Sequence, residues 1–279
     1  MTSRSTRRSI AGETVEILDR GTYVSNGEQV SIEPQLTESL AGTRLYTPEQ
    51  AESLAAKLAA PDSPHNTQLR VDNCTTFAAV RRQIAEGFRD PVCLNFASAK
   101  NQGGGFLGGS QAQEESLARA SGLYASLQKA PTYYEVNRAG GSCLYTHHLI
   151  YSPRAPVFRD DDDQLLPQPY ATSIITSPAV NAGAVRQNEP QNVTQIEPVM
   201  RERLAHVLAV ALAHGHDAIV LGAWGCGVFR NDPGEVARWM HEALTQDPRF
   251  VGAFAKVDFA VLDFTSEKKT YEAFRQQFA

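Results

Sequence analysis

The amino-acid sequence predicts an α/β protein in which a mixed, mostly parallel sheet is flanked by helices on both faces. From about residue 67 to the C-terminus, short apolar segments alternate with segments of helical period. Two glycine-rich loops, at residues 103–109 and 222–229, each follow an apolar segment and precede a helical one. Because ligands bind at the carboxyl ends of the strands in such folds, we expect both loops at one edge of the sheet, facing a shared cleft.

The residues before this core are expected to form a mainly helical extension that packs on it. Residues 5–20 are predicted to form a helix, and Asn-Gly at residues 26–27 predicts a tight hairpin turn. Thr47 is followed by proline, which is typical of an N-cap and the first helical position. The loop at residues 61–66 contains two prolines, so we place the boundary of the extension at residue 65.

The elements of the core are predicted from runs of β-branched residues, helical spacing of apolar residues, and breakers. In chain order we expect strand 68–71, helix 75–86, strand 91–97, helix 111–127, strands 144–151 and 157–159, strand 171–180, a long helix from Pro198 to Gly215, strand 218–221, a helix capped by Asn231 or Asp232, strand 259–264, and a terminal helix from Ser266. This alternation favours a sheet buried on both faces.

The composition excludes several classes of protein. The chain has 279 residues, 42% of them hydrophobic, and a net charge of −5, so we expect no direct nucleic-acid binding through a basic surface. The four cysteines show no C-x-x-C pair and no zinc-type spacing, which favours free thiols in a cytoplasmic protein. The longest apolar stretch is too short to span a bilayer, so we expect no membrane association, and we expect a monomer.

The first glycine loop carries the strongest chemical signal. Backbone N–H groups of Gly103–Gly105 can approach a ligand closely and bind an anion beside a helix N-terminus. We expect Ser110 as the N-cap of that helix, with Gln113 completing a capping box. Glu114 and Glu115 then project about 100° apart from its start. A phosphate cradle with two carboxylates at its rim suits an enzyme that cleaves a glycosidic bond in a nucleotide sugar. The alternative is an ordinary strand–helix turn whose acids favour the helix dipole.

The full string resembles a family signature. GGG, seven residues and then QEE, at 103–115, is similar to the signature of bacterial-type poly(ADP-ribose) glycohydrolases, as are the flanking strings LNFASA and SLARASGLYASL. Gln102 stands where the family commonly has proline. The resemblance implies a macrodomain-like catalytic domain at residues 66–279, with residues 1–65 as the extension usual in this group.

The resemblance also implies a mechanism. The second glutamate of QEE is catalytic in the family, so Glu115, protonated, is expected to donate its proton to the ribose–ribose glycosidic oxygen and then to activate a water molecule. Glu114 is expected to bind ribose hydroxyls and Gln113 to hold the loop. The substrate would be poly(ADP-ribose) on modified proteins, cleaved mainly from the chain terminus to release ADP-ribose. No metal and no cofactor is expected.

The expected ligand contacts come from both glycine loops. Val228 and Phe229 resemble the family residues that press on the diphosphate and the distal ribose, and Asn95 and Asn101 are candidates for ribose contacts. The expected ligand-binding residues are Gly103, Gly104, Gly105, Asn101, Gln113, Asn95, Gly225, Cys226, Gly227, Val228 and Phe229. Two other functions stay open: a macrodomain that binds ADP-ribose without cleaving it, and a hydrolase of mono-ADP-ribose. The adjacent Glu114 and Glu115 argue against the first, because a binding module does not need them.

Overall fold

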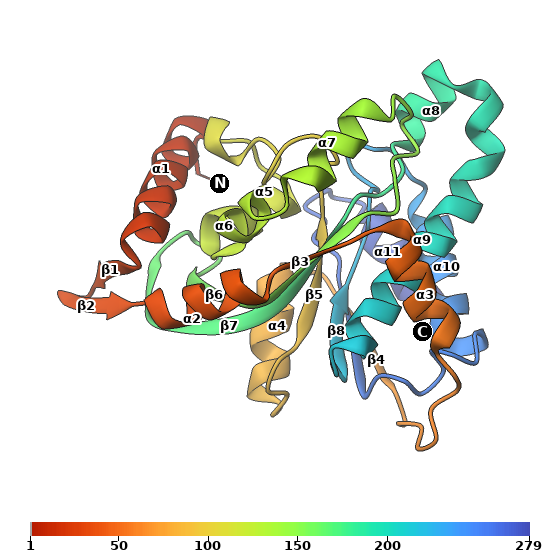
Figure 1. Cartoon of the computed structure of the whole chain (residues 1–279), viewed down its shortest axis with the longest axis horizontal. Helices are drawn as coiled ribbons and strands as arrows, with labels where there is room; N and C mark the ends of the chain where they lie inside the picture. The colour runs from red at the N-terminus through yellow and green to blue at the C-terminus, as the bar shows by residue number, and fades with distance from the viewer. Residues whose placement is uncertain (1) are drawn as a thin grey trace.

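A seven-stranded sheet runs through the middle of the molecule in the computed structural model, which describes residues 2–279 (Figure 1). The elements are, in chain order, α1 (Arg4–Arg20), β1 (Thr22–Ser25), β2 (Glu28–Ser31), α2 (Glu33–Gly42), β3 (Arg44–Tyr46), α3 (Pro48–Lys57), β4 (Gln68–Asp72), α4 (Thr76–Ala85), β5 (Val92–Phe96), the 3₁₀ helix η1 (Phe106–Gly108), α5 (Gln113–Ala120), α6 (Leu123–Gln128), α7 (Pro131–Ala139), β6 (Leu149–Arg159), β7 (Leu165–Ser177), α8 (Ala182–Asn188), the 3₁₀ helix η2 (Pro190–Gln195), α9 (Ile196–Ala213), β8 (Ala218–Leu221), α10 (Pro233–Gln246), β9 (Lys256–Ala260) and α11 (Lys269–Gln277).

The strand order of this sheet is β3-β6-β7-β5-β8-β9-β4. The pairs β7/β5, β5/β8, β8/β9 and β9/β4 are parallel, whereas β6 pairs antiparallel with both β7 and β3. Parallel neighbours need crossover connections, and helices on the two faces supply them. The predicted mixed, mostly parallel sheet is therefore confirmed.

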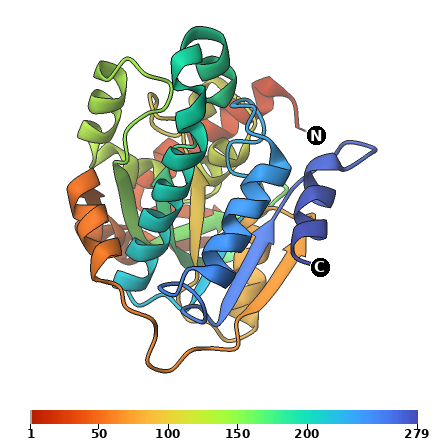
Figure 2. The same ribbon diagram turned by 90° about the vertical axis from the view of Figure 1, so that its right-hand side faces the viewer.

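Helices cover both faces of the sheet because the strands are buried on both sides. In β5, Val92 and Leu94 join the core formed with α3, α9, α10 and α11, whereas Cys93 joins the core formed with α4, α5, α6 and α7. This alternation is the two-residue period of a strand. Figure 2 shows α9 and α10 lying side by side over their face of the sheet.

The N-terminal extension packs against the core along its length: α1 lies against η1 and α5, α2 and β3 against β6, and α3 against α9. Helix α1 ends at Gly21, which has a positive φ of 68°, and β1 and β2 form the predicted hairpin with positive φ at Asn26 and Gly27. Thr47 and the side chain of Gln50 form a capping box at the start of α3. The sequence analysis did not predict α2 or β3, although β3 pairs with β6 at the edge of the main sheet. Our division of the chain at residue 65 stays a prediction.

The predicted helix 111–127 is wrong, because the chain breaks into α5 and α6. The break lies at Ser121, which forms a bridge with Val157, and the N–H of Gly122 donates to the carbonyl of Pro156 at 2.8 Å. Apolar spacing continues across the break, so the sequence pattern did not reveal it. Contact with β6 replaces the helical hydrogen bonds at this point.

The predicted pair of strands 144–151 and 157–159 is also corrected. A single strand, β6, covers Leu149–Arg159, and residues 144–148 lie outside the sheet. Pro153 falls at an irregularity in the register between Ser152 and Ala155, where Arg154 has a positive φ of 44°. A bulge therefore accommodates the proline that suggested a break.

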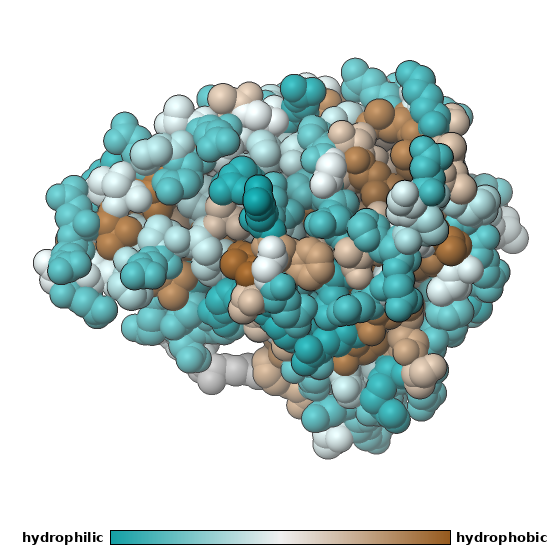
Figure 3. Space-filling view, turned by 90° about the horizontal axis from the view of Figure 1, so that it is seen from below, coloured by the Kyte–Doolittle hydropathy of each residue, from teal (hydrophilic) through white to brown (hydrophobic). Residues whose placement is uncertain are grey.

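The surface carries no broad apolar face in the view of Figure 3, where hydrophobic patches are small and separated by hydrophilic residues. Among residues 2–279, no helix is long and apolar enough to cross a membrane. The predicted cytoplasmic location stays a prediction. The four cysteines are free thiols, of which Cys93 is fully buried.

Candidate active site

Both glycine loops begin at the same edge of the sheet. They follow β5 and β8, which are adjacent and parallel, so their carboxyl ends point the same way. A Cβ atom on Gly222 would lie 3.1 Å from the ring of Phe96, so the two strand ends are in contact distance. The prediction that the loops share one edge is confirmed.

The first loop turns tightly around Gly104. Gly103 and Gly104 have φ values of 66° and 61°, which favour glycine. A Cβ atom on Gly104 would lie 2.5 Å from Oε1 of Glu115 and 3.0 Å from Oε2 of Glu114. Two carboxyl groups therefore converge on a backbone position that has no room for a side chain.

The helix that carries the glutamates begins later than predicted. Its N-cap is Ala112, which has no capping side chain, and α5 starts at Gln113. The predicted Ser110 cap and its capping box are therefore wrong. Glu114 and Glu115 both lie in the first turn of α5, where the helix dipole stabilises negative charge.

The two carboxyl groups have different surroundings. Glu114 is 3% exposed; its Oε2 accepts from the N–H of Ser98 at 2.7 Å and its Oε1 from the amide of Asn95 at 3.4 Å. Burial, partly offset by the Ser98 hydrogen bond, raises the pKa of Glu114 to about 8. Glu115 is half-buried, and its Oε1 accepts from the N–H of Gly105 at 2.9 Å. Only Glu115 is open to a ligand.

Two predicted site residues, Gln113 and Asn95, connect the segment that carries Glu114 and Glu115 to the sheet. Gln113 accepts from the N–H of Phe96 at 2.9 Å and donates to the carbonyl of Leu94 at 2.7 Å, so it ties α5 to the end of β5. Asn95 is fully buried and donates to Thr176 Oγ1 at 3.2 Å as well as to Glu114. Asn95 therefore lies beneath the glutamates rather than on the surface.

Asn101 lies at the start of the turn. Its side chain is exposed, and its carbonyl accepts from the N–H of Gly104 at 3.0 Å. The N–H of Asn101 donates to Ser98 Oγ at 3.1 Å, so the segment between β5 and the glycines is ordered without proline at position 102.

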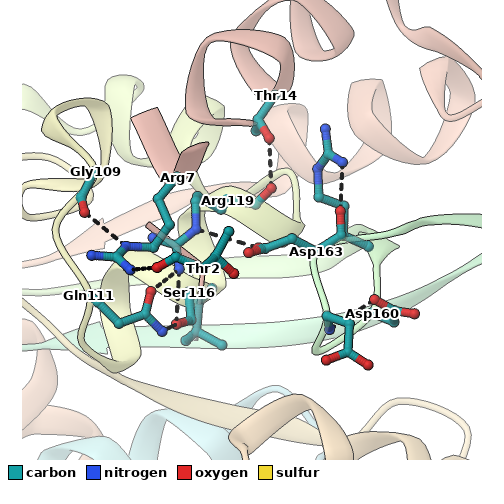
Figure 4. Close-up of polar contacts among 12 residues, drawn as sticks. Thr2, Arg7, Thr14, Gly109, Gln111, Ser116, Arg119, Asp160 and Asp163 are labelled. Atoms are coloured by element: carbon teal, nitrogen blue, oxygen red, sulfur yellow. Dashed lines mark hydrogen bonds and ion pairs between the residues drawn. The ribbon is translucent and has the colours of Figure 1, made fainter. Parts of the chain in front are cut away.

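Arginine side chains from two helices fasten the far half of this loop. Arg4 and Arg7 of α1 donate from Nε to the carbonyls of Gly108 and Gly109, at 3.0 and 2.9 Å. Arg119 of α5, which is 1% exposed, donates from its guanidinium to the carbonyl of Ser110 at 2.9 Å (Figure 4).

Arg119 is itself held from several sides. Figure 4 shows its guanidinium beside Gln111, Ser116 and Asp163, with Thr14 of α1 donating to its carbonyl at 2.7 Å. Asp163 belongs to the turn between β6 and β7. The buried side chain and backbone of Arg119 therefore connect α1, the end of the first glycine loop and the turn between β6 and β7.

The second loop is anchored at its ends and projects in its middle. Trp224, 1% exposed, donates from its indole to the carbonyl of Ser177 at 3.1 Å. Asn231 donates to the carbonyls of Val180 and Gly225 at 2.8 and 3.1 Å. Between these anchors lie the remaining predicted ligand residues, Cys226, Gly227, Val228 and Phe229.

The projecting part offers both donors and apolar surface. Val228 is 85% exposed, and Gly227 has no atom within 4 Å of a Cβ position. Within residues 2–279, the N–H groups of Gly227 and Val228 donate to no acceptor. Phe229 packs on Tyr145, with ring centroids 5.9 Å apart. Backbone donors of this kind suit an anion.

A third segment pair meets at the same edge beyond β9. The amide of Asn73 donates to the carbonyl of Asp263 at 2.9 Å, and the N–H of Asp263 donates to Asn73 Oδ1 at 3.0 Å. Phe264 follows and is 72% exposed. Asn73 follows β4 and Asp263 follows β9, which are parallel neighbours, so the structure brings the two segments together.

Several supporting residues were missed from the sequence. Ser98 donates to Glu114, Arg119 donates to the loop, Thr176 accepts from Asn95, and Tyr145 contacts the second loop. Ser98 and Arg119 lie inside the motif strings, which was a usable signal. Thr176 and Tyr145 come from distant segments, so nothing in their sequence context linked them to the site.

Comparison with known proteins adds independent information. The family model described as "Microbial-type PARG, catalytic domain" matches residues 11–160. The crystal structure of a poly(ADP-ribose) glycohydrolase from Thermomonospora curvata is 46% identical, with a TM-score of 0.93 over 98% of this chain and 100% of that chain. A second structure of that protein, with the inhibitor ADP-HPD bound, has a TM-score of 0.91 over the same shares of the two chains and 46% identity.

A poly(ADP-ribose) glycohydrolase from Deinococcus radiodurans in complex with ADP-ribose is also similar. It is 52% identical, with a TM-score of 0.83 over 88% of this chain and 97% of that chain. Comparison with curated protein sequences gave no significant match. These matches agree with the observed α/β fold.

Proposed function

The chain belongs to the family of microbial-type poly(ADP-ribose) glycohydrolases, and from this premise we propose how its site cleaves the polymer. It is a hydrolase of poly(ADP-ribose), and the bond cleaved is the ribose–ribose O-glycosidic bond. In the proposal Glu115 is the general acid and then the general base. The reaction releases ADP-ribose.

One observation carries the assignment of Glu115. Of two adjacent carboxyl groups, only that of Glu115 is open to a ligand, and the N–H of Gly105 holds it at the rim of the glycine loop at 2.9 Å. A carboxyl group that is fixed by the backbone and faces the ligand can reach a leaving oxygen without reorganisation.

Glu114 enters the proposal as a positioning residue. The sequence suggested that it binds ribose hydroxyls, but it is 3% exposed and both of its oxygens accept hydrogen bonds from the protein. With a pKa raised to about 8 by burial, it is mostly neutral at pH 7. A neutral neighbour does not repel the carboxylate that forms on Glu115 when the proton is transferred.

The chemical steps follow from this arrangement. Protonated Glu115 gives its proton to the glycosidic oxygen as the bond to C1″ breaks, leaving an oxocarbenium-like ribose and a free hydroxyl on the departing sugar. The resulting carboxylate then takes a proton from a water molecule, whose oxygen bonds to C1″. The carboxyl group is restored at the end of the cycle.

The diphosphate would lie between the two glycine loops. The proposed contacts are the backbone of Gly103–Gly105 on one side and of Gly225–Gly227 on the other, with Val228 and Phe229 against the distal ribose. The unpaired N–H groups of Gly227 and Val228 support this placement, since a diphosphate needs several donors and the protein has no broad positive surface. Asn101 is proposed as the ribose contact from the first loop.

The test is the release of free ADP-ribose from automodified poly(ADP-ribose) by wild type and Glu115→Gln, with calorimetric ADP-ribose binding to both. Loss of a general acid lowers turnover by about 10²- to 10⁴-fold. We expect Glu115→Gln to bind ADP-ribose as wild type does and to lose turnover by at least 100-fold. Full turnover in Glu115→Gln would exclude the assignment.

The alternatives give different outcomes in the same experiment. Wild type that binds ADP-ribose and releases none from the polymer would be a binding module, and wild type that acts only on mono-modified protein would be a mono-ADP-ribose hydrolase. The proposed attack from the chain terminus predicts that monomeric ADP-ribose appears from the first time points, whereas internal cleavage would yield oligomers first.

A further inference from the structure

A cluster of two histidines and a glutamate lies outside the proposed active site. His147 comes from the segment between α7 and β6, whereas Glu202 and His206 lie one turn apart on α9. One possible ligand atom from each residue lies within 4.8 Å of the other two, and Nε2 of His147 is 3.6 Å from Oε2 of Glu202. His147 was expected in a strand, but it lies in an irregular segment before β6.

We propose that His147, Glu202 and His206 form a binding site for a transition-metal dication, with Zn²⁺ as the preferred ion. Zinc binds imidazole nitrogen and carboxylate oxygen at about 2.0–2.2 Å, which places tetrahedral ligand atoms about 3.4 Å apart. The His147–Glu202 distance already agrees with this value. Glu202 has a 53% exposed side chain, so it can turn to complete the set.

The hydrogen bonding of the histidines supports the site. His206 is 2% exposed, and its Nδ1 is buried without a hydrogen-bond partner. Nδ1 of His147 is also buried without a partner, but the nitrogen of His147 that faces Glu202 is Nε2, so the support from an unpartnered nitrogen comes from His206. A buried imidazole normally satisfies its ring nitrogens, because an unmet polar atom costs about 1–3 kcal/mol. The two ring centroids are 5.3 Å apart at an interplanar angle of 77°, a T-shaped arrangement.

The ligand atoms of the cluster indicate which ion it prefers, and a neighbouring arginine adds a positive charge. Arg203, on the same helix as Glu202 and His206, is fully buried and donates to the carbonyls of Pro178 and Leu144 at 2.8 and 2.9 Å. The two imidazole nitrogens favour Zn²⁺ over Mg²⁺ and Ca²⁺, which prefer oxygen ligands, whereas the positive charge of Arg203 opposes all three dications equally.

The position of the cluster shows how an ion can reach it and which part of the protein a bound ion would affect. Glu202 and His206 line a cavity of about 870 Å³ between α3, α9 and α10, through which an ion can enter. His147 lies two residues after Tyr145, which packs on Phe229 of the second glycine loop. A bound ion would therefore fasten to α9 the segment that supports this loop. No chemical step of the hydrolysis passes through the ion.

The experiment is a calorimetric titration of Zn²⁺ into tag-free, chelator-treated protein, with Mg²⁺ and Ca²⁺ titrations alongside. We expect one Zn²⁺ per chain, no heat from Mg²⁺ or Ca²⁺, and affinity at least about tenfold weaker in Glu202→Gln and His147→Asn. Glu52→Gln is the matched control, because Glu52 lines the same cavity but lies outside the cluster. It should bind as wild type does.

A second measurement identifies the ligands and does not depend on substrate. Co²⁺ should give visible absorption without a thiolate charge-transfer band, since the proposed ligands are nitrogen and oxygen. A thiolate band would assign binding to one of the cysteines and overturn the proposal. Absence of Zn²⁺ binding, or equal affinity in wild type and Glu202→Gln, would overturn it too. Glu202 is exposed, so its variant is expected to fold, which circular dichroism checks.

Discussion

The two glycine loops at the sheet edge are built in opposite ways. The first is fastened along its length: Phe106 is fully buried, arginines hold the carbonyls of Gly108 and Gly109, and Gly105 holds Glu115. The second is fastened near Trp224 and Asn231 and at Phe229, whose carbonyl accepts from the N–H of Gly183 at 2.9 Å, whereas Gly227 and Val228 between them are exposed.

The difference matches the two tasks that we propose for them. General acid catalysis requires a carboxyl group fixed to within a fraction of an ångström, so the loop beside Glu115 gains from many contacts. A loop that covers a flexible diphosphate gains from donors that are free until the ligand arrives. In this proposal the rigid first loop serves the chemical step and the more exposed second loop serves ligand binding. Substitutions in one loop should therefore affect one task more than the other.

The largest expected effect concerns the buried carboxyl group of Glu114, in the first turn of α5 beside the rigid loop. The pKa of Glu114 is raised from 4.5 to about 8 by burial, so the stabilisation is complete below about pH 4.5 and is lost as the pH rises through about 8. Over that window we expect the free energy of unfolding to fall by on the order of 4 kcal/mol through this group. Glu114→Gln should lack this decline.

Urea unfolding at a series of pH values measures how the free energy of unfolding depends on pH. The difference between wild type and Glu114→Gln isolates the contribution of this carboxyl from those of the other acids. Glu135→Gln, at an exposed site, should run parallel to wild type at every pH. Parallel curves for Glu114→Gln as well would mean that Glu114 is ionised in the folded protein.

The next effect tests how tightly the first loop is fitted. Gly104→Ala would place a methyl group 2.5 Å from Glu115 Oε1 at a positive φ, so the carboxyl group must move. We expect kcat to fall by about 100-fold, since a displacement of 1 Å has that cost. The matched control is Gly227→Ala in the second loop, where no atom lies within 4 Å. Equal losses in both variants would remove the contrast between the loops.

A smaller effect is expected from the second loop. Phe229→Ala removes a ring that packs on Tyr145 and is proposed to lie against the distal ribose. We expect KM to rise about tenfold with kcat little changed, because an aromatic contact is worth about 1 kcal/mol or slightly more. Steady-state kinetics on polymer separates the two constants. A fall in kcat at constant KM would give this loop a part in the chemical step.

The smallest effect should come from the outer support of the first loop. Arg7→Ala removes one hydrogen bond to the carbonyl of Gly109. A net hydrogen bond is worth about 0.5–1.5 kcal/mol, so we expect kcat to fall by a few-fold and KM to stay constant. Arg20→Ala, on the same helix but paired only with Glu16, is the control and should leave both constants unchanged.

Much of this arrangement could be predicted from local sequence patterns. Glycines at 103–105 with two following acids predicted a loop under a helix N-terminus, and the strand-like segments before each glycine loop predicted their common edge. The resemblance to the glycohydrolase signature then directed attention to Glu115. Each of these depends on neighbours within a few residues, which is what a sequence pattern records.

The remaining features depend on residues far apart in the chain. Glu114 and Glu115 differ because Glu114 is buried and accepts hydrogen bonds from Ser98 and Asn95. Two adjacent glutamates in a sequence do not show which of them will be buried. Arg119 was counted only as part of a helix, although it organises the loop exit. The break between α5 and α6 arises from pairing with β6, some 35 residues later, and the cap at Ser110 failed because the arginine contacts hold that segment outside the helix.

The order of synthesis has a consequence for when the sheet can be completed. Strand β4, near residue 70, pairs only with β9, whose register partners begin at Lys256. Closing so long a segment loses chain entropy that only the finished contact offsets. A nascent chain therefore carries β4 unpaired until nearly all of it has left the ribosome, and chains that stop before residue 256 should keep an open edge prone to aggregation.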